Sequence, residues 1–385
     1  MFPYIFVILV LFFGALLEIT IADKKNLKIY FLFESLLILL LVGLRFHTGA
    51  DWYAYEYAFY KGPELGNWHN WELGYHLLSL LCNKIFGNYY AFQFLISLFV
   101  VFSTSKFVWK YAEYPLTSLF LFFIMFVPNG ILMCTMRQSI ALAIILFGTK
   151  YILNRSFFKF LIIVYIASLF HISSIAALPL YFCTYKIAKS NLIIAILIAQ
   201  VFYFFPKLIA HFVLLIIPIL PGRLEDIAQS YMNGILFSGT VSFETGYYYI
   251  CSIIISIVLI LLINRKNETH NLYVNALTIT TIISALSNSL SILNRFEPTY
   301  LIFGLLAYPL VFNIKIKHIK KTVVPIVVLV LLGLFYYIPF NALLTSTSIS
   351  SLSGRPENYG WTPYYNVLFH PAEAEKRLDW NEKEK

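Results

Sequence analysis

Long apolar segments recur along this chain, and they constrain its fold more than any other feature. A helix needs about 20 apolar residues to cross the hydrocarbon core of a bilayer. The segments that approach this length are 2–21, 28–44, 89–109, 116–133, 137–153, 157–183, 191–205, 207–220, 246–263, 271–293, 297–313 and 321–340. Continuous apolar blocks indicate helices rather than a barrel. The sequence therefore predicts an all-α, polytopic integral membrane protein with about 12 transmembrane helices, outward-facing loops and short interfacial helices.

The basic residues predict how the chain is oriented, because Lys and Arg concentrate in short cytoplasmic loops. The basic loops are Lys24/Lys25/Lys28, Lys106/Lys110, Lys150/Arg155/Lys159, Arg265/Lys266 and Lys315/Lys317/Lys320/Lys321. The opposite side then receives the outer loops 45–88 and 221–245. We expect one polytopic membrane domain at 1–345 and an extracytoplasmic C-terminal tail at 346–385, with a disordered end. Residues 72–87 are too short to span, which favours an interfacial or re-entrant helix.

Several function classes are disfavoured by what the sequence lacks. It holds no Walker loop, no HExxH, no GxSxG, no clustered DxD and no zinc-ligand spacing. An enzyme or transporter driven by nucleotide hydrolysis is therefore not expected, and neither is a metallohydrolase. We also expect no metal and no cofactor. The net charge of +9 comes mostly from short loops, so it indicates topology and not nucleic-acid binding.

Charged residues at the ends of apolar segments are the candidates for a functional site, since such groups are unfavourable in a membrane unless paired or hydrated. Arg45 ends one apolar segment, and Arg137 begins a helix at its predicted outer end. Arg137 beside free backbone N–H groups would make an anion site, although a snorkelling arginine is the alternative. Arg295 ends a polar stripe that begins at Ser284 and is expected to lie on one face of a single helix. Helix–helix contact by small polar residues is the alternative for the stripe. Glu297 would pair with Arg295 or cap the helix that Pro298 opens.

His171 and the outward carboxylates are candidates for proton transfer. His171 would act as a general base or donate to an anion, and a buried histidine bonded to a serine is the equally weighted alternative. The outward carboxylates are Asp51, Glu56, Glu72 and Glu244. Aromatic residues flank them, among them Trp52, Tyr53, Tyr55 and Tyr75. These rings form either an interfacial belt, which is the commoner case, or a groove that stacks on sugars.

An ordered set of short motifs resembles the EpsG family, which are Wzy-like polymerases of bacterial surface polysaccharides. The motifs are Gly43-Leu44-Arg45, Thr48 to Tyr55, Glu72-Leu73-Gly74-Tyr75, Met136-Arg137-Gln138-Ser139, Phe170-His171-Ile172-Ser173, Asn294-Arg295-Phe296 and Trp361-Thr362-Pro363-Tyr364. Each motif alone is weak, but together they cover nearly the whole chain. The resemblance implies a multi-pass enzyme of the bacterial cytoplasmic membrane that joins undecaprenyl-diphosphate-linked oligosaccharide units on the outer face. It also implies contact with membrane lipid and with a chain-length regulator protein.

A mechanism follows from this resemblance. Arg45, Arg137 and Arg295, with Gln138, would bind the diphosphate leaving group. One of His171, Asp51 and Glu72 would take the proton of the acceptor hydroxyl.

The aromatic residues Trp52, Tyr53, Tyr55 and Tyr75 would align the acceptor sugar in this mechanism. Two other functions remain open. One is an O-antigen ligase-like glycosyltransferase, and the other is a flippase or transporter of lipid-linked oligosaccharides.

Overall fold

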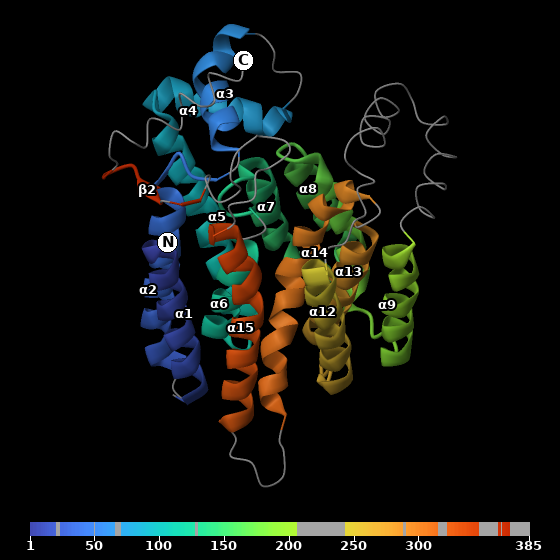
Figure 1. The fold of residues 1–385 in the computed structure, drawn as a ribbon. Coiled ribbons are helices and arrows are strands. Elements are labelled where there is room, and N and C mark those ends of the chain that lie inside the picture. The colour runs from blue at the N-terminus through green and yellow to red at the C-terminus, as the bar shows by residue number, and fades with distance from the viewer. Residues whose placement is uncertain are drawn as a thin grey trace. The chain divides into compact units, whose positions relative to one another are not determined.

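The computed structural model of the chain is built almost wholly of helices (Figure 1). It describes residues 1–20, 24–49, 51–65, 71–127, 130–205, 243–287, 290–314, 322–345, 361–362 and 364–369. The span expected at 207–220, most of the outer loop at 221–245, Asn288, Pro363 and most of the tail at 346–385 lie outside these residues. The all-α membrane class predicted from the sequence is confirmed for the described part of the chain.

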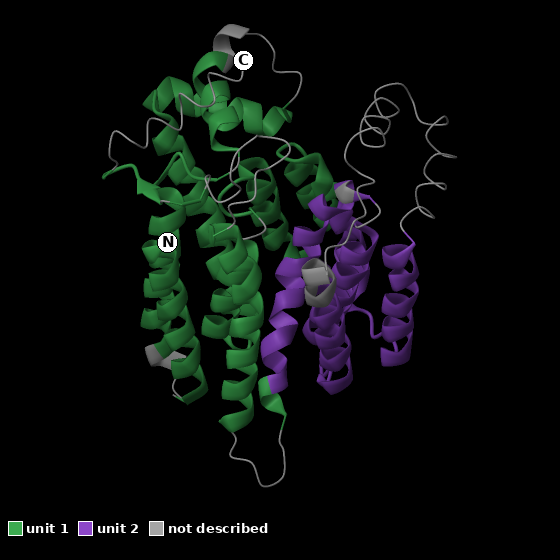
Figure 2. Cartoon of the chain, viewed as in Figure 1, with its two compact units in different colours: residues 1–151, 158–175, 312–385 green, residues 152–157, 176–311 purple. Residues whose placement is uncertain are grey.

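The chain divides into two compact units (Figure 2). The first unit comprises Met1–Tyr151, Phe158–Ile175 and Phe312–Lys385, and the second comprises Ile152–Phe157 and Ala176–Val311. The prediction of one membrane domain at 1–345 with a separate tail stays a prediction.

The first unit is a helical bundle with two shorter helices joined to it. Its bundle helices are α1 (Phe2–Thr20), α2 (Lys24–Gly43), α5 (Tyr89–Tyr111), α6 (Pro115–Phe126), α7 (Met136–Leu153) and α15 (Val323–Thr345). The shorter helices α3 (Trp52–Leu65) and α4 (Leu73–Phe86) pack against each other and against α5. A further helix, α8 (Phe157–Ser168), leads into the 3₁₀ segment η2 (Ile172–Thr184), of which only the part up to Ile175 belongs to this unit.

A buried carboxylate fixes how two bundle helices meet. Glu18 of α1 is only 8% exposed. It accepts hydrogen bonds from the backbone N–H groups of Leu116 at 3.0 Å and Thr117 at 2.8 Å. The first N–H groups of a helix have no partner within it, and a negative charge there is favourable. Glu18 therefore caps α6 from the neighbouring helix and satisfies donors that would otherwise be buried without partners.

The described part of the chain contains four helices long and apolar enough to cross a membrane. They are α1, α5, α7 and α15. Other apolar helices are shorter, such as α6, α8 and α9 (Lys189–Phe204). The count of twelve spans is not confirmed. The segment 157–183, expected to be one continuous span, is interrupted because α8 ends at Ser168 and η2 begins at Ile172.

A two-stranded sheet joins the C-terminal tail to the first unit, which the helical patterning did not predict. Strand β1 (Arg45–Phe46) pairs antiparallel with β2 (Tyr365–Asn366). The Tyr364 hydroxyl donates to the Leu41 carbonyl at 2.7 Å, and the Tyr4 hydroxyl donates to the Trp361 carbonyl at 3.1 Å. Strand pairing and hydrogen bonds therefore hold the described part of the tail against the end of α2.

The second unit is centred on α13 (Glu268–Ser287), which packs against α9, α12 (Phe243–Leu262) and α14 (Glu297–Gly304). It also holds the 3₁₀ segment η5 (Ser291–Arg295), and η6 (Leu305–Asn313) follows α14. The expectation that Ser284 and Arg295 lie on one helix face is wrong, because α13 ends at Ser287 and η5 begins only at Ser291. Glu297 and Pro298 do open α14, as their sequence indicates.

Candidate functional site

Three helix N-termini of the first unit meet around the carboxylate of Glu72. Glu72 is the residue before α4. Its Oε2 accepts from Nη1 of Arg137 at 2.6 Å, in the first turn of α7. Its Oε1 accepts from the backbone N–H of Ile172 at 3.2 Å, at the start of η2. The Glu72 carboxylate thus occupies a position where a guanidinium and helix N-termini favour an anion.

Gly74 allows α4 to approach the break between α8 and η2. Its backbone N–H donates to the Leu169 carbonyl at 2.7 Å. A Cβ at position 74 would lie 2.8 Å from that same oxygen, which is too close for a real contact. The segment Glu72-Leu73-Gly74 therefore has two functions at this break. Gly74 lets the backbone of α4 come close to Leu169, and the Glu72 carboxylate accepts from the backbone N–H of Ile172. Together they account for why η2 begins at Ile172.

His171 lies in this break and is 8% exposed. Its Nδ1 is 2.6 Å from the Ser173 hydroxyl and 3.3 Å from the Ser173 backbone N–H. A backbone N–H can only donate, so Nδ1 is the acceptor in that contact and a neutral His171 then carries its proton on Nε2. The arrangement favours His171 as a hydrogen-bond donor over His171 as a base at Nδ1.

An aromatic cluster supports Arg137 from the other side. The guanidinium carbon lies 4.8 Å from the centre of the Trp71 ring, a cation–π distance. Tyr55 packs edge-on against Trp71 at 5.1 Å and against Tyr75 at 5.7 Å. Burial raises the pKa of the Tyr55 phenol, and the neighbouring Arg137 guanidinium offsets part of that rise. Arg137 is thus held between an aromatic face and a carboxylate, with its side chain 26% exposed.

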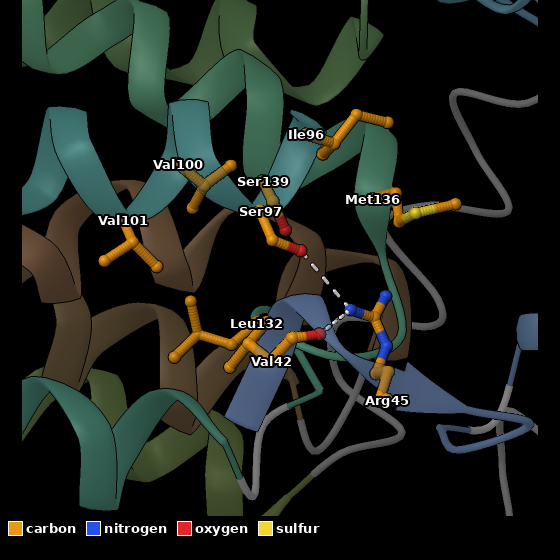
Figure 3. A pocket seen from close by; sticks show the side chains of 9 residues that line it. All are labelled: Val42, Arg45, Ile96, Ser97, Val100, Val101, Leu132, Met136 and Ser139. Carbon is orange, nitrogen blue, oxygen red and sulfur yellow. Dashed lines mark hydrogen bonds between the residues drawn. The ribbon is translucent and has the colours of Figure 1, made fainter. Parts of the chain in front are cut away.

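Arg45 lies in a different environment. It is 2% exposed, and it lines a small cavity of about 10 Å³ together with residues of α2, α5 and α7 (Figure 3). Its Nη1 donates to the Val42 carbonyl at 2.5 Å and lies 3.5 Å from the Ser97 hydroxyl. Its Nε has no hydrogen-bond partner within the described residues. Burial lowers the pKa of Arg45, but an arginine stays charged in proteins.

Gly49 lets the loop after Arg45 adopt a backbone conformation that other residues rarely take. Gly49 has a φ of 106°, and a Cβ there would lie 2.5 Å from the Met133 carbonyl oxygen. The loop therefore packs directly on the backbone that precedes α7. This contact and the β1–β2 pairing hold the backbone at and after Arg45 in place.

His47 and Glu56 lie within ion-pair distance of each other, a pairing that the sequence did not predict. Nε2 of His47 is 3.2 Å from Oε2 of Glu56, and the other oxygen of Glu56 accepts from the Tyr90 hydroxyl at 3.1 Å. The His47 ring is stacked between Phe46 and Trp52, with 3.9 Å between ring centres on each side. A histidine directly after Phe46 and five residues before Trp52 was the available signal in the sequence. The contact fixes the loop that leads from Arg45 to α3.

The remaining predicted residues divide by exposure. Asp51 is exposed directly before α3, whereas Trp52 is buried with one face covered by His47. Tyr53 is half-buried, and Tyr75 is buried in the aromatic cluster. These positions leave Asp51 and Tyr53 as the accessible members of this set.

Two further predicted residues differ in their burial. Gln138 is 7% exposed within α7. Arg295 is exposed at the end of η5 and belongs to the second unit. The structure therefore brings together Glu72, Arg137 and the backbone beside His171, with Tyr55 and Tyr75 as their packing support.

The fold and this cluster define a helical membrane protein with a paired arginine and carboxylate at converging helix N-termini. The chain belongs to the EpsG family, whose family model matches residues 28–365. Membership makes it a polysaccharide polymerase-like membrane protein. No curated protein and no solved structure matches the chain.

Proposed function

We propose that the protein joins undecaprenyl-diphosphate-linked oligosaccharide units into a polysaccharide on the outer face of the bacterial cytoplasmic membrane. In this reaction a hydroxyl of the acceptor unit attacks the anomeric carbon of the donor glycan. The glycosidic bond forms, the bond to the lipid diphosphate breaks, and the hydroxyl proton leaves. The observation that carries the proposal is the Glu72–Arg137 pair at converging helix N-termini, in a member of the EpsG family.

The Glu72 carboxylate marks where the diphosphate would bind. Each of its oxygens accepts from a different donor, one from Arg137 and one from the Ile172 backbone. Phosphate oxygens use the same donors with the same geometry. The diphosphate would compete with Glu72 for Arg137, and the stabilisation would increase as negative charge develops on the leaving group. Both side chains are partly exposed, at 26% for Arg137 and 18% for Glu72, which supports access from outside the bundle.

The proton-transfer roles divide between two residues. With its proton on Nε2, His171 would donate to a phosphate oxygen of the leaving group. Asp51 is an exposed carboxylate whose charge affects the Tyr55 phenol beside Arg137. Asp51 would therefore take the acceptor proton, and Glu72, once released from Arg137, would be the alternative base.

Substrate binding would extend beyond this centre. Tyr53 is the accessible ring of the four predicted for the acceptor sugar, and Tyr57 on the next turn of α3 is 39% exposed. Arg45 would act on the diphosphate through its positive charge alone. It would not touch the substrate, because it is buried. Arg295, expected from the sequence to bind the diphosphate, stays a prediction. The chain would cross the membrane about 12 times, by the length rule for spans. Basic loops in the cytoplasm would then place this site outside.

A surface-glycan ladder tests the proposal. A strain that lacks the protein is complemented with the wild type, with Arg137→Ala or with Lys84→Ala, an exposed control at the far end of α4. We expect single repeat units on the lipid for the deletion and for Arg137→Ala, and long chains for the other two.

Two other outcomes would contradict the polymerase function, and a third would contradict the role of Arg137. Long chains that form but fail to attach to their final acceptor would indicate a ligase. Lipid-linked units that accumulate on the inner leaflet would indicate a flippase. Full polymer length with Arg137→Ala would show that the reaction does not need Arg137.

A further inference from the structure

A second cavity lies between α5 and α7, in the last turns of both helices. Its volume is about 210 Å³, and three lysines line it: Lys106 and Lys110 from α5, and Lys150 from α7. All three are exposed. These positions belong to basic loops predicted to face the cytoplasm, so the cavity would open at the opposite membrane face from the outward site proposed above.

Apart from the lysines, the residues that line the cavity are mostly apolar, and Ser103 is the polar one discussed below. Leu146 and Phe147 of α7 line it, and Lys106 lies 5.8 Å from the centre of the Phe147 ring. Ser103 also lines it, is 2% exposed, and its hydroxyl has no hydrogen-bond partner within the described residues. A buried hydroxyl without a partner is unfavourable. This hydroxyl is the donor that a ligand in the cavity would satisfy.

Charge in the cavity is of one sign. None of the ion pairs within the described part of the chain involves Lys106, Lys110 or Lys150. Lysines in the last turn of a helix complement its dipole, and basic loops set topology. Those effects account for Lys110 and Lys150 on their own. They do not account for a cavity that gathers lysines from two helices over a buried, unpartnered hydroxyl.

We propose that this cavity binds the phosphate headgroup of an anionic phospholipid from the cytoplasmic leaflet. Lysines act as point charges toward phosphate, and basic pockets between transmembrane helices at this face bind anionic headgroups. At about 210 Å³ the cavity is smaller than the roughly 300–1,000 Å³ of sites that enclose a drug-sized ligand. It therefore takes the headgroup, while the acyl chains remain in the bilayer. Lys106 and Lys150 bind the phosphate from opposite helices, and Ser103 donates to it.

Native mass spectrometry of the purified full-length protein tests this site. The protein is delipidated and titrated with phosphatidylglycerol, phosphatidylcholine or inorganic phosphate. The test variant is Lys106→Gln/Lys150→Gln. The matched control is Lys28→Gln/Lys159→Gln, which removes two exposed lysines that do not line the cavity.

We expect phosphatidylglycerol to bind the wild type and the control with equal affinity. The cavity variant should bind it about 30-fold more weakly, from the usual contribution of each lysine near an anionic lipid surface. Ser103→Leu, which fills the cavity and keeps all three charges, should weaken binding as well. If Ser103→Leu does not fold, the two lysine variants decide the outcome by themselves.

Each other result would overturn the proposal. Equal losses in the cavity variant and the control would mean diffuse attraction to a basic face. Equal binding of phosphatidylcholine would mean that the charges do not select the headgroup. Inorganic phosphate that binds as tightly as the lipid would mean a free-anion site. None of these results bears on Arg137 or on polymer formation, so the two proposals fail separately.

Discussion

Arg45 and Arg137 lie in the same unit, and both were expected to bind the same leaving group, but their surroundings differ. Arg45 is 2% exposed and donates to a backbone carbonyl, with no carboxylate against it in the described residues. The Arg137 side chain is 26% exposed and pairs with a carboxylate at 2.6 Å. An arginine that already holds an exchangeable anion can release it to a substrate. An enclosed arginine that binds its own backbone cannot do so without opening the fold.

The comparison separates two uses of the same side chain. The enclosure of Arg45 depends on β2 and on Tyr364, which come from the far end of the chain. Arg137 depends on Glu72, Trp71 and the helix ends beside them. We therefore expect substitutions at Arg45 to change mainly stability, and substitutions at Arg137 to change mainly activity.

The largest effect is expected for Arg137→Ala. It removes a donor to the developing charge, so polymerisation on lipid-linked units should fall about 10²–10³-fold. The amount of folded protein should stay near that of the wild type. Arg137→Lys should not restore the rate, because an ammonium cannot reproduce the guanidinium fork. A rate assay with purified protein measures this, and a full rate with either variant would contradict the account.

Arg45→Ala should have the next largest effect, on folding. It leaves the Val42 carbonyl without its donor and opens a cavity, which should lower the free energy of unfolding by about 3 kcal/mol. Arg45→Met fills the volume without burying a charge and should cost less. Denaturation in detergent measures both. If Arg45→Ala keeps wild-type stability and loses only activity, the two arginines do not differ as described.

Gly74→Ala should impair the Arg137 region by an intermediate amount. The added methyl meets the Leu169 carbonyl oxygen, so α4 must shift and move Glu72 away from Ile172. We expect a loss of about 1–3 kcal/mol in stability and a lower polymerisation rate in the protein that remains folded. Ala91→Gly, in the first turn of α5, is a control for backbone flexibility. A wild-type rate in folded Gly74→Ala would show that Glu72 need not lie at this position.

Tyr364→Phe should have the smallest effect. It removes the hydroxyl that donates to the Leu41 carbonyl and so loosens the tail over Arg45. Loss of one such hydrogen bond lowers stability by about 1 kcal/mol. Activity per folded molecule should not change, since Tyr364 does not contact the Glu72 cluster. A selective loss of activity would place the tail in the reaction.

Much of the helical class was predictable from apolar length alone, and so was the start of α7 at Met136, beside a charged residue. The interruption at His171 was not. The sequence from Phe157 to Leu178 contains neither proline nor glycine, so no local signal separates α8 from η2. The break is instead stabilised by Glu72 and Gly74, about 100 positions earlier in the chain.

Pairings between distant residues were likewise beyond the sequence. Glu72 and Arg137 were each recognised as candidates, but their ion pair spans 65 positions. The β1–β2 contact involves two residues on each side and has no periodicity to detect. The role of Trp52 was also hidden, because a ring beside a predicted outer loop can stack on a sugar or on a neighbouring histidine. The structure shows the second arrangement.

The most direct test of the account is the affinity of the purified protein for undecaprenyl diphosphate. It should be measured in the Lys106→Gln/Lys150→Gln background, so that the proposed headgroup cavity does not contribute. Adding Arg137→Gln should weaken binding at least about 10-fold, as expected for a lost charged hydrogen bond. Adding Lys84→Gln should leave it unchanged. Equal affinity with and without the Arg137 guanidinium would contradict the claim that this arginine binds the diphosphate.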